Sequence, residues 1–476
     1  IDASGQGTDS GGQVTFAAAV GGNTSLTSLA VTTDRAGADS ILLGDVTTGG
    51  AQSYTGLITL NDAASVLTTT NNNVTFSAAV TDGGGSSSLQ VSAGTGTVAL
   101  GGNVTADNGF TVGGATGTLR VDGNLTIDTT TGGGAVDING NIDANTIDTE
   151  ILTIAAGAGT VALNTNGSSA TGGATRLGGL VVTSSNTVTL DSNVTVGNGA
   201  NAIDLDLSGA TGGIAVGGAI TIEANAGRID LDGGGASGVN FAGNNITITA
   251  DEIDFTGGAN SVVGTGTIVL QSSTVGQNTI LNAATDPDGA PQTANMDLTA
   301  ADLAALGTNA GGNAYGNGFT SLTIGRTDGT GTVSFNAGTP PTTFNTDTTL
   351  RAPGAGGTVN VNQAIAVNTD LPLTLNASVI TVGADIDAPG TGSITFTDTT
   401  GSGTATLAGA AREIDADTGS FVTSATMNLA DGGFDLTLTA DEINFGGGAD
   451  SVSGSGNLLL RSKTASQAVN IGDNAD

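Results

Sequence analysis

A long internal repeat sets the strongest limit on the fold. Residues 246–286 return as 436–476 with 19 identities in 41 aligned positions and no gap. Both copies run through a Thr-rich segment, Asp-Glu-Ile, a Phe, a Gly-Gly-Ala turn and an aliphatic segment. Such periodicity is typical of repeat arrays, in which each unit packs only on its neighbours. We therefore expect an array that grows in one direction.

The composition favours many short strands joined by tight turns. Val, Ile and Leu alternate every few residues with Gly, Asn, Asp, Ser and Thr, and glycine accounts for 80 of the 476 residues. This pattern predicts strands bounded by turns. Charged residues make up only 11%, which is too few for a typical disordered chain. The absence of a sustained Gly-X-Y period excludes collagen.

Shorter echoes suggest the length of one coil, or rung. Residues 14–16 return as 74–76, and 91–100 return in similar form as 154–163. Both echoes recur after about 60 residues, and three rungs per step give a rung of about 20 residues. A rung of that length holds about three short strands, and rungs stacked about 4.8 Å apart form a parallel β-solenoid.

The side-chain alternation within the repeat indicates which residues face inward. Ile246 and Ile248 alternate with Thr247 and Thr249, so the aliphatic side chains are expected inside and the threonines outside. We predict an all-β fold in which 1–476 is one continuous solenoid. The chain starts and stops within repeat-like sequence, so we interpret it as an internal segment of a longer chain.

One segment departs from the strand pattern. Residues 298–306 have helical spacing, with Thr299 placed as the N-cap and Asp302 three residues later. Gly307 or Gly311 would end the helix. We predict that 286–318 is a loop and helix excursion against the solenoid wall, which covers apolar side chains and is not a functional lid.

The residue inventory argues against catalysis. Histidine and cysteine are absent, Lys463 is the only lysine, and the eight arginines are scattered. This removes the commonest general base, thiol nucleophiles and zinc sites built on these ligands. Trp is absent and tyrosine occurs only at Tyr54 and Tyr315, so stacking surfaces for sugars are scarce. We predict no enzyme, and no catalytic, cofactor-binding or metal residues are assigned.

The repeated Asp-Glu pairs have two interpretations. Asp251 with Glu252, and Asp441 with Glu442, resemble paired catalytic carboxylates. Neighbouring acids in a repeated turn are more commonly a solvated corner, and a catalytic site needs no duplicate in a later repeat. We therefore expect solvated corners.

Calcium is a possible ligand of aspartates spaced i and i+2, because Ca²⁺ prefers hard oxygen donors. The Gly-Gly-x-Gly-x-Asp nonapeptide of calcium β-rolls and the EF-hand loop are both missing. No cofactor is predicted, and Ca²⁺ stays an open alternative. The aspartate pairs are Asp204 and Asp206, Asp230 and Asp232, Asp286 and Asp288, Asp385 and Asp387, and Asp415 and Asp417.

Net charge and hydropathy limit the partners. The net charge of −34 repels nucleic acid and anionic membranes, and no apolar run is long enough to span a bilayer. Asn-x-Thr triplets match glycosylation acceptors, but in a solenoid they more often mark a strand start with a stackable Asn. These triplets begin at Asn73, Asn103, Asn124, Asn193 and Asn245.

Four phrases carry a resemblance to a known family. They are ADEIDFTGGANSV at 250–262, LTAADLAAL at 298–306, FTSLTIGRTDGTGT at 319–332 and LRAPGAGG at 350–357. The chain resembles the large β-strand-repeat exoproteins of cyanobacteria and other Gram-negative bacteria, which are similar to filamentous haemagglutinin. The resemblance implies a right-handed parallel β-helix, export to the cell surface, and roles in adhesion, filaments or matrix.

We therefore expect an extracellular structural segment of a bacterial surface filament or adhesin that contacts further copies head to tail through its rungs. An alternative is an adhesive stalk whose loops bind a glycan or cell-surface partner, for which 314–316 is the only aromatic-bearing insertion. A third alternative is a β-helix enzyme acting on polysaccharides.

Overall fold

The computed structural model confirms an all-β parallel β-solenoid. The chain divides into two compact units, Ile1–Asn244 and Asn245–Asp476, and each is described by itself. The expectation of one continuous column over 1–476 stays a prediction. The described residues are 1–5, 11–35, 40–113, 117–163, 170–197, 202–206, 212–233, 238–283, 295–307, 314–316, 318–336 and 342–467.

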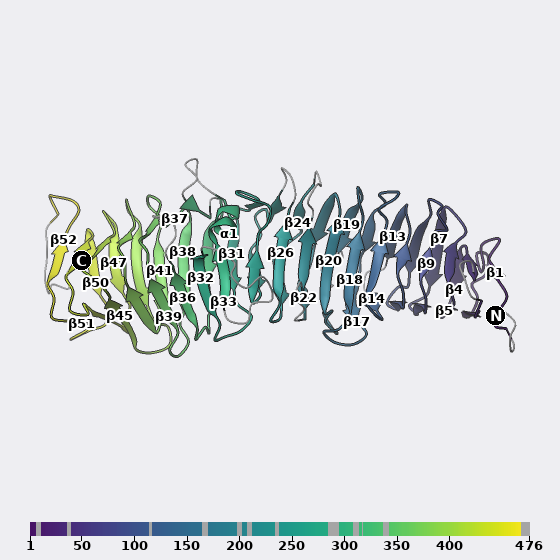
Figure 1. Cartoon of the computed structure of the whole chain (residues 1–476), viewed down its shortest axis with the longest axis horizontal. Coiled ribbons are helices and arrows are strands. Elements are labelled where there is room, and N and C mark those ends of the chain that lie inside the picture. Colours follow the sequence, from purple (N-terminus) through teal and green to yellow (C-terminus); the bar gives the residue numbers. More distant parts are fainter. Residues whose placement is uncertain are drawn as a thin grey trace. The chain divides into compact units, whose positions relative to one another are not determined.

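Unit 1 consists of strands that recur on three sheets (Figure 1). The first sheet holds β1 (Val14–Thr15), β3 (Ile41–Leu43), β6 (Ile58–Leu60), β9 (Val80–Thr81), β12 (Val104–Thr105), β15 (Leu125–Asp128), β18 (Ile151–Ala155), β20 (Gly179–Ser184), β23 (Ile203–Asp206) and β26 (Arg228–Asp232). The second holds β4 (Val46–Thr48), β7 (Ala64–Thr69), β10 (Ser88–Ser92), β13 (Gly109–Gly113), β16 (Val136–Ile138), β19 (Thr160–Leu163), β21 (Thr187–Leu190), β24 (Ile214–Val216) and β27 (Val239–Asn240). The third holds β2 (Leu29–Thr32), β5 (Gln52–Thr55), β8 (Val74–Phe76), β11 (Thr97–Leu100), β14 (Thr118–Val121) and β17 (Asn141–Ala144). In addition, β22 (Val194–Val196) pairs in parallel with β25 (Ile220–Ala224).

Unit 2 repeats this arrangement with its own strands. One sheet holds β28 (Ile246–Thr249), β31 (Thr267–Gln271), β35 (Ser321–Ile324), β38 (Asp347–Ala352), β41 (Leu373–Ala377), β44 (Ser393–Thr397), β47 (Ser420–Thr423) and β50 (Glu442–Phe445). A second holds β33 (Asn295–Thr299), β32 (Asn278–Ala283), β36 (Thr332–Phe335), β39 (Thr358–Val361), β42 (Val379–Val382), β45 (Gly403–Leu407), β48 (Met427–Ala430) and β51 (Val452–Ser453). A third holds β34 (Ala314–Tyr315), β37 (Thr342–Phe344), β40 (Ile365–Val367), β43 (Ile386–Asp387), β46 (Arg412–Asp415), β49 (Leu436–Thr439) and β52 (Leu458–Arg461), while β29 (Glu252–Asp254) and β30 (Val262–Val263) each lie at the end of a sheet.

The rungs hold three strands each, as predicted, but they are longer than the sequence echoes suggested. Successive strands β3, β4 and β5 lie on three different sheets before β6 returns to the first. The Val66 N–H donates to Asp45 of the preceding rung, 21 residues earlier. Further along unit 1, the Thr221 N–H donates to Asn193 of the preceding rung, 28 residues earlier. The extra length lies in the turns between strands, which the strand spacing alone does not fix.

The repeats in the sequence do not keep to one face of the solenoid. The echo at 14–16 forms β1 of the first sheet, whereas 74–76 forms β8 of the third. The inference of three rungs between successive echoes was therefore wrong. The long repeat behaves in the same way, because β28 and its counterpart β49 belong to different sheets of unit 2. The repeated sequence specifies a local series of strands and turns. The lengths of the turns between the two copies determine which sheet of the solenoid each copy joins.

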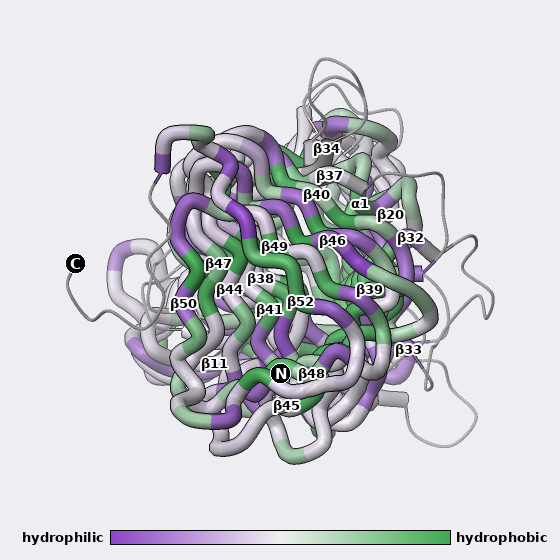
Figure 2. Tube along the Cα trace, turned by 90° about the vertical axis from the view of Figure 1, so that its left-hand side faces the viewer, coloured by the Kyte–Doolittle hydropathy of each residue, from purple (hydrophilic) through white to green (hydrophobic). Residues whose placement is uncertain are grey.

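The core of each unit consists of aliphatic ladders. Ile41, Ile58, Val80, Val104 and Ile127 occupy successive rungs of unit 1 and are at most 1% exposed. Figure 2 shows hydrophobic and hydrophilic segments alternating along the chain, as expected when inward and outward positions alternate. Burying one such side chain stabilises the fold by about 1.5–3 kcal/mol.

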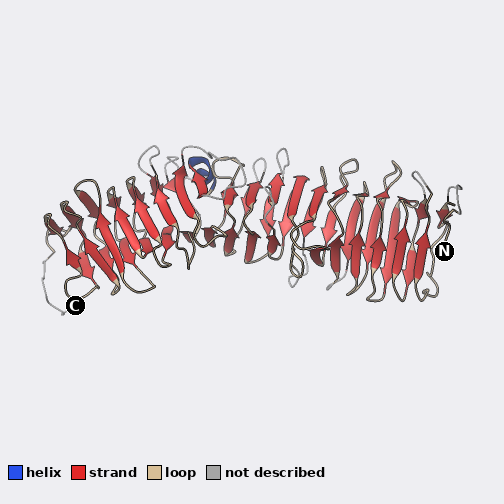
Figure 3. Cartoon of the chain, turned by 60° about the horizontal axis from the view of Figure 1, so that its bottom comes forward, coloured by secondary structure: helices blue, strands red, loops and turns tan. Residues whose placement is uncertain are grey.

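The predicted helix is confirmed as α1 (Ala300–Ala305), the blue element in Figure 3. Thr299 is its N-cap, and Thr299 and Asp302 exchange both bonds of a capping box. Gly307 follows the C-cap with φ of +95°, which glycine adopts without strain. The structure corrects the expected excursion in one respect: β33 is a strand that pairs in parallel with β32, so part of 286–318 extends a sheet.

Among the described residues, no helix has both the length and the apolar character needed to cross a membrane.

Candidate functional site

The polar side chains at strand starts connect successive rungs. The Oδ1 atoms of Asn73, Asn103 and Asn124 accept hydrogen bonds of 2.9 Å from backbone N–H groups of Thr97, Thr126 and Ile151, each one rung later. Asn193 and Asn245 accept from the N–H groups of Thr221 and Thr267 in the same way. The interpretation of Asn-x-Thr as a strand start is therefore confirmed. We call this contact the inter-rung Asx bond.

Aspartate forms the same contact in both copies of the long repeat. Asp251 Oδ1 accepts from the Thr274 N–H at 3.2 Å, and Asp441 Oδ1 accepts from the Thr464 N–H at 2.8 Å. The pKa of Asp441 is lowered, chiefly by the hydrogen bond from the Thr464 side chain and also by the one from the Thr464 backbone. A glutamine closes each turn, because Gln277 and Gln467 both donate through Nε2 to the carbonyl oxygen of that aspartate. Inspection of the sequence missed these glutamines, although they are identical in the aligned repeat.

The solvated-corner prediction is wrong for the first copy. Asp251 is 5% exposed and Glu252 is fully buried, whereas Glu442 is exposed. The reason is that β33 and α1 cover the first copy: the Asp297 N–H donates to Glu252 Oε2 at 3.4 Å. Sequence identity between the copies therefore did not predict equal burial.

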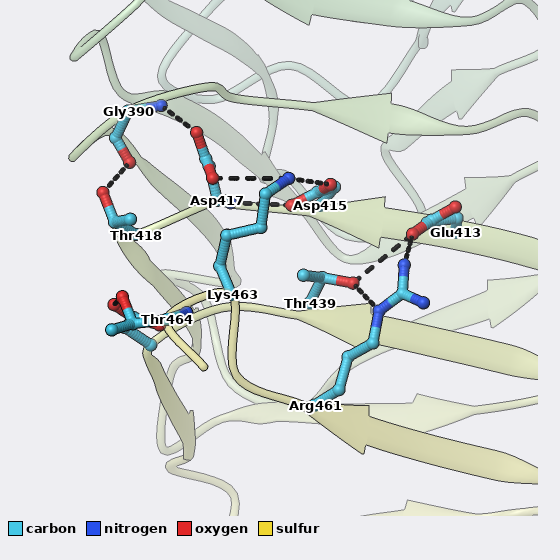
Figure 4. Close-up of polar contacts among 10 residues, drawn as sticks. Gly390, Glu413, Asp415, Asp417, Thr418, Thr439, Arg461, Lys463 and Thr464 are labelled. Atoms are coloured by element: carbon cyan, nitrogen blue, oxygen red, sulfur yellow. Dashed lines mark hydrogen bonds and ion pairs between the residues drawn. The ribbon is translucent and has the colours of Figure 1, made fainter. Parts of the chain in front are cut away.

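Lys463 neutralises a cluster of carboxylates drawn from earlier rungs (Figure 4). Its Nζ atom lies 3.2 Å from Asp415 Oδ2 and 3.3 Å from Asp417 Oδ1. Asp387 lies in register with Asp415 on the neighbouring strand. The pKa of Asp387 is raised, mainly because the carboxyl is desolvated and also because Asp415 repels its charge. Hydrogen bonding and attraction to Asp415 raise the pKa of Lys463. The only lysine of the chain thus occupies the place that a cation would take beside these acids.

A second polar stack lies beside the lysine cluster. Arg461 donates through Nε to Thr439 Oγ1 at 2.7 Å and forms an ion pair with Glu413. Gly390 donates its N–H to Asp417 Oδ2 at 2.9 Å, so this carboxylate is shared between a backbone amide and Lys463. The contacts of Arg461 join three successive rungs, through β46, β49 and β52.

Two of the other predicted aspartate pairs lie in register with each other on neighbouring strands. Asp204 lies in register with Asp230, and Asp206 with Asp232, while Asp230 forms an ion pair with Arg228 at 3.0 Å. Asp385 accepts the Glu413 N–H at 2.9 Å. Asp286 and Asp288 lie outside the described residues. Within the described part, no group of three or more His, Cys, Asp or Glu residues is arranged to hold a metal ion.

Neither tyrosine presents a described ring to solvent. Tyr54 is fully buried, stacks on Phe76 with centroids 5.7 Å apart, and donates to Gln52 Oε1 at 2.9 Å. Burial raises the pKa of Tyr54. Tyr315 lies in β34, whose backbone pairs with β37, and its side chain is outside the described part.

We expect Lys463→Gln to destabilise unit 2 modestly and in a salt-dependent manner. The substitution leaves Asp387, Asp415 and Asp417 without their cation, but the pair is partly exposed, so the cost is at most about 1 kcal/mol. The difference in melting temperature should shrink in 1 M salt, where screening acts over about 3 Å. It should also be larger at pH 7 than at low pH, because the pKa of Asp387 is raised and its protonation removes part of the negative charge that Lys463 offsets. Lys463→Arg keeps the charge and serves as the control; equal losses for both variants would contradict an electrostatic role.

Comparisons with protein-family models, with curated proteins and with solved structures give no match. The family resemblance noted from the sequence therefore stays a proposal.

Proposed function

We propose that the chain is a non-catalytic structural segment of an extracellular bacterial surface filament or adhesin, and that it assembles by stacking rungs. The observation that carries this proposal is the contact between rungs, where strands pair in parallel and Asx side chains bind the next rung's backbone. These contacts create a stiff parallel stack and leave the described tyrosine ring, Tyr54, inside the core. Such a scaffold suits mechanical support, and it has few side chains of the kinds that commonly catalyse reactions.

The edge of β52 supports stacking as the mode of assembly. Leu458, Leu459 and Leu460 are 43%, 51% and 36% exposed. The carbonyl oxygens of Asn457 and Arg461 accept from the N–H groups of Leu436 and Ala440. Because backbone groups alternate in direction along a strand, the N–H groups of Leu458 and Leu460 point away from β49. Among the described strands β52 is the last of its sheet, and such an apolar edge is a template for another strand.

Electron microscopy and sedimentation of the full chain at increasing concentration test this proposal. We expect filaments whose abundance rises with concentration, and Leu460→Pro should reduce the assembled fraction strongly, because proline removes one outward N–H at an edge. Leu460→Val keeps that N–H and a β-forming side chain, so it should still assemble. Monomers alone at the highest concentration would contradict the proposal, as would equal assembly of both variants.

A further inference from the structure

The two copies of the long repeat have the same local backbone but different surroundings. Strands β28, β29 and β30 of the first copy correspond to β49, β50 and β51 of the second in the aligned repeat. Gly258 and Gly448 have φ of +85° and +81°, and Asn260 and Asp450 both have φ of +62°. Strands β29, β30, β50 and β51 each lie at the end of a sheet. The first copy therefore shows what such an end accommodates.

In the first copy, β33 and α1 cover this end through three polar contacts. The Asp297 N–H donates to Glu252 Oε2 at 3.4 Å. Asp302 Oδ1 accepts the Phe255 N–H at 2.9 Å, and the Asn260 N–H donates to Ala304 O, also at 2.9 Å. Apolar side chains accompany these bonds, since those of Met296, Leu298 and Leu303 are fully buried. Every residue from Asp251 to Phe255 is buried as a result.

Within residues 436–467, which the structure describes, the second copy retains the three receiving groups and no strand or helix covers them. They are the Glu442 carboxylate and the N–H groups of Phe445 and Asp450. Glu442 is exposed and Phe445 is only partly buried. Val452, the counterpart of the fully buried Val262, lines a hollow of about 170 Å³ together with Leu436 and Leu458. The second copy thus presents exposed end strands that carry the same three polar groups as the first copy.

One difference between the copies makes docking at the second copy easier. Asp254 of the first copy faces Asp302, and burial together with this repulsion raises the pKa of Asp302. At the matching position the second copy has Asn444. An incoming acidic helix cap would therefore meet a neutral amide in place of a carboxylate.

We propose that the surface formed by Glu442–Phe445 and Val452–Ser453 is a docking site for a strand and helix segment of the type seen at 295–306. The occupant is an extended strand followed by a Thr-capped helical turn, whose first-turn aspartate accepts the Phe445 N–H. This inference is independent of rung stacking. In the first copy β31 pairs with β35 while β33 and α1 cover β29, so an occupant on β50 leaves the outward edge of β52 available.

The test appends a second copy of residues 295–307 to Asp476 of the full chain through a Gly/Ser linker of about 20 residues, which spans about 25 Å. The tether raises the effective concentration of a segment that binds weakly when free. Amide hydrogen exchange at Phe445 and Asp450 is then compared with that of a chain carrying the linker alone. We expect protection of both amides to increase at least about tenfold.

Two variants of the appended copy keep the test specific. Asp302→Ala in that copy removes the acceptor for the Phe445 N–H, and Leu303→Asp places a charge at a side chain that is fully buried in the native segment. Both should abolish the added protection, whereas the native residues 295–306 stay unchanged in every chain. No added protection with the unmodified segment would overturn the proposal, and so would equal protection with either variant. Filament formation is scored separately, so failure of one proposal does not mimic failure of the other.

Discussion

Replacing Phe421 with alanine is expected to cost unit 2 about 3–5 kcal/mol of unfolding free energy. The ring is fully buried in β47 and lies between rings of the neighbouring rungs, with centroid distances of 5.3 Å to Phe396 and 6.3 Å to Phe445. Truncation leaves a cavity and also removes two aromatic contacts, each worth about 0.5–1.5 kcal/mol beyond burial. The loss should be greatest in the rungs on either side, because each rung is stabilised by its neighbours.

Denaturant titration followed by circular dichroism measures this cost, and hydrogen exchange locates it. Phe434→Ala is the matched control, since this phenylalanine is partly exposed at a turn and its removal should cost about 1 kcal/mol or less. A Phe421→Ala chain as stable as the Phe434→Ala chain would show that the aromatic stack does not hold these rungs together.

The second large effect is expected from adding a single methyl group at Gly140. A Cβ atom there would lie 2.0 Å from the Gly117 carbonyl oxygen of the preceding rung. That oxygen accepts the Asn141 N–H at 2.9 Å, so Gly140→Ala must separate two backbones that are hydrogen-bonded. We expect a loss of about 1–3 kcal/mol from overpacking and about 1 kcal/mol from the weakened bond.

Gly123→Ala is the control for the substitution at Gly140. A Cβ atom at Gly123 meets no atom within 4 Å, and its φ is outside the left-handed region. This change should leave unit 1 unaltered or stabilise it by about 0.4–1 kcal/mol, because alanine restricts the unfolded chain. If thermal melting were lowered equally by both substitutions, the close approach of backbones between rungs would not explain the need for glycine at Gly140.

Local chemistry explains why parts of this fold were predictable from sequence. The helix α1 followed from Thr299 and Asp302, because a capping box depends on only a few neighbouring residues. The Asn-x-Thr triplets identified strand starts for a similar reason. The side-chain oxygen of an asparagine such as Asn103 accepts a hydrogen bond from a backbone N–H of the next rung. In the Gly-Gly-Ala turns, the second glycine, Gly258 or Gly448, has a positive φ, which glycine adopts without strain.

The errors arose where distant parts of the chain meet. The length of a rung depends on its turns, which tolerate insertions at low cost. The similar segments 14–16 and 74–76 therefore lie on different sheets, and their spacing did not give the number of residues per rung. Burial of Glu252 depends on β33, 45 residues further along the chain. The role of Lys463 depends on Asp415, 48 residues earlier and two rungs away. No local pattern contains such information.

The inter-rung Asx bonds give the solenoid a chemical polarity. In each of these bonds the acceptor side chain belongs to the earlier rung and the amide donor to the later one, as in Asn73 with Thr97 and Asn245 with Thr267. At these positions one face of a rung therefore offers side-chain oxygens and the opposite face offers amide protons, whereas the Gly390 N–H donates to Asp417 in the reverse direction. Two such columns match only when they point the same way, so fibres built by this rule would be vectorial, with chemically distinct tips.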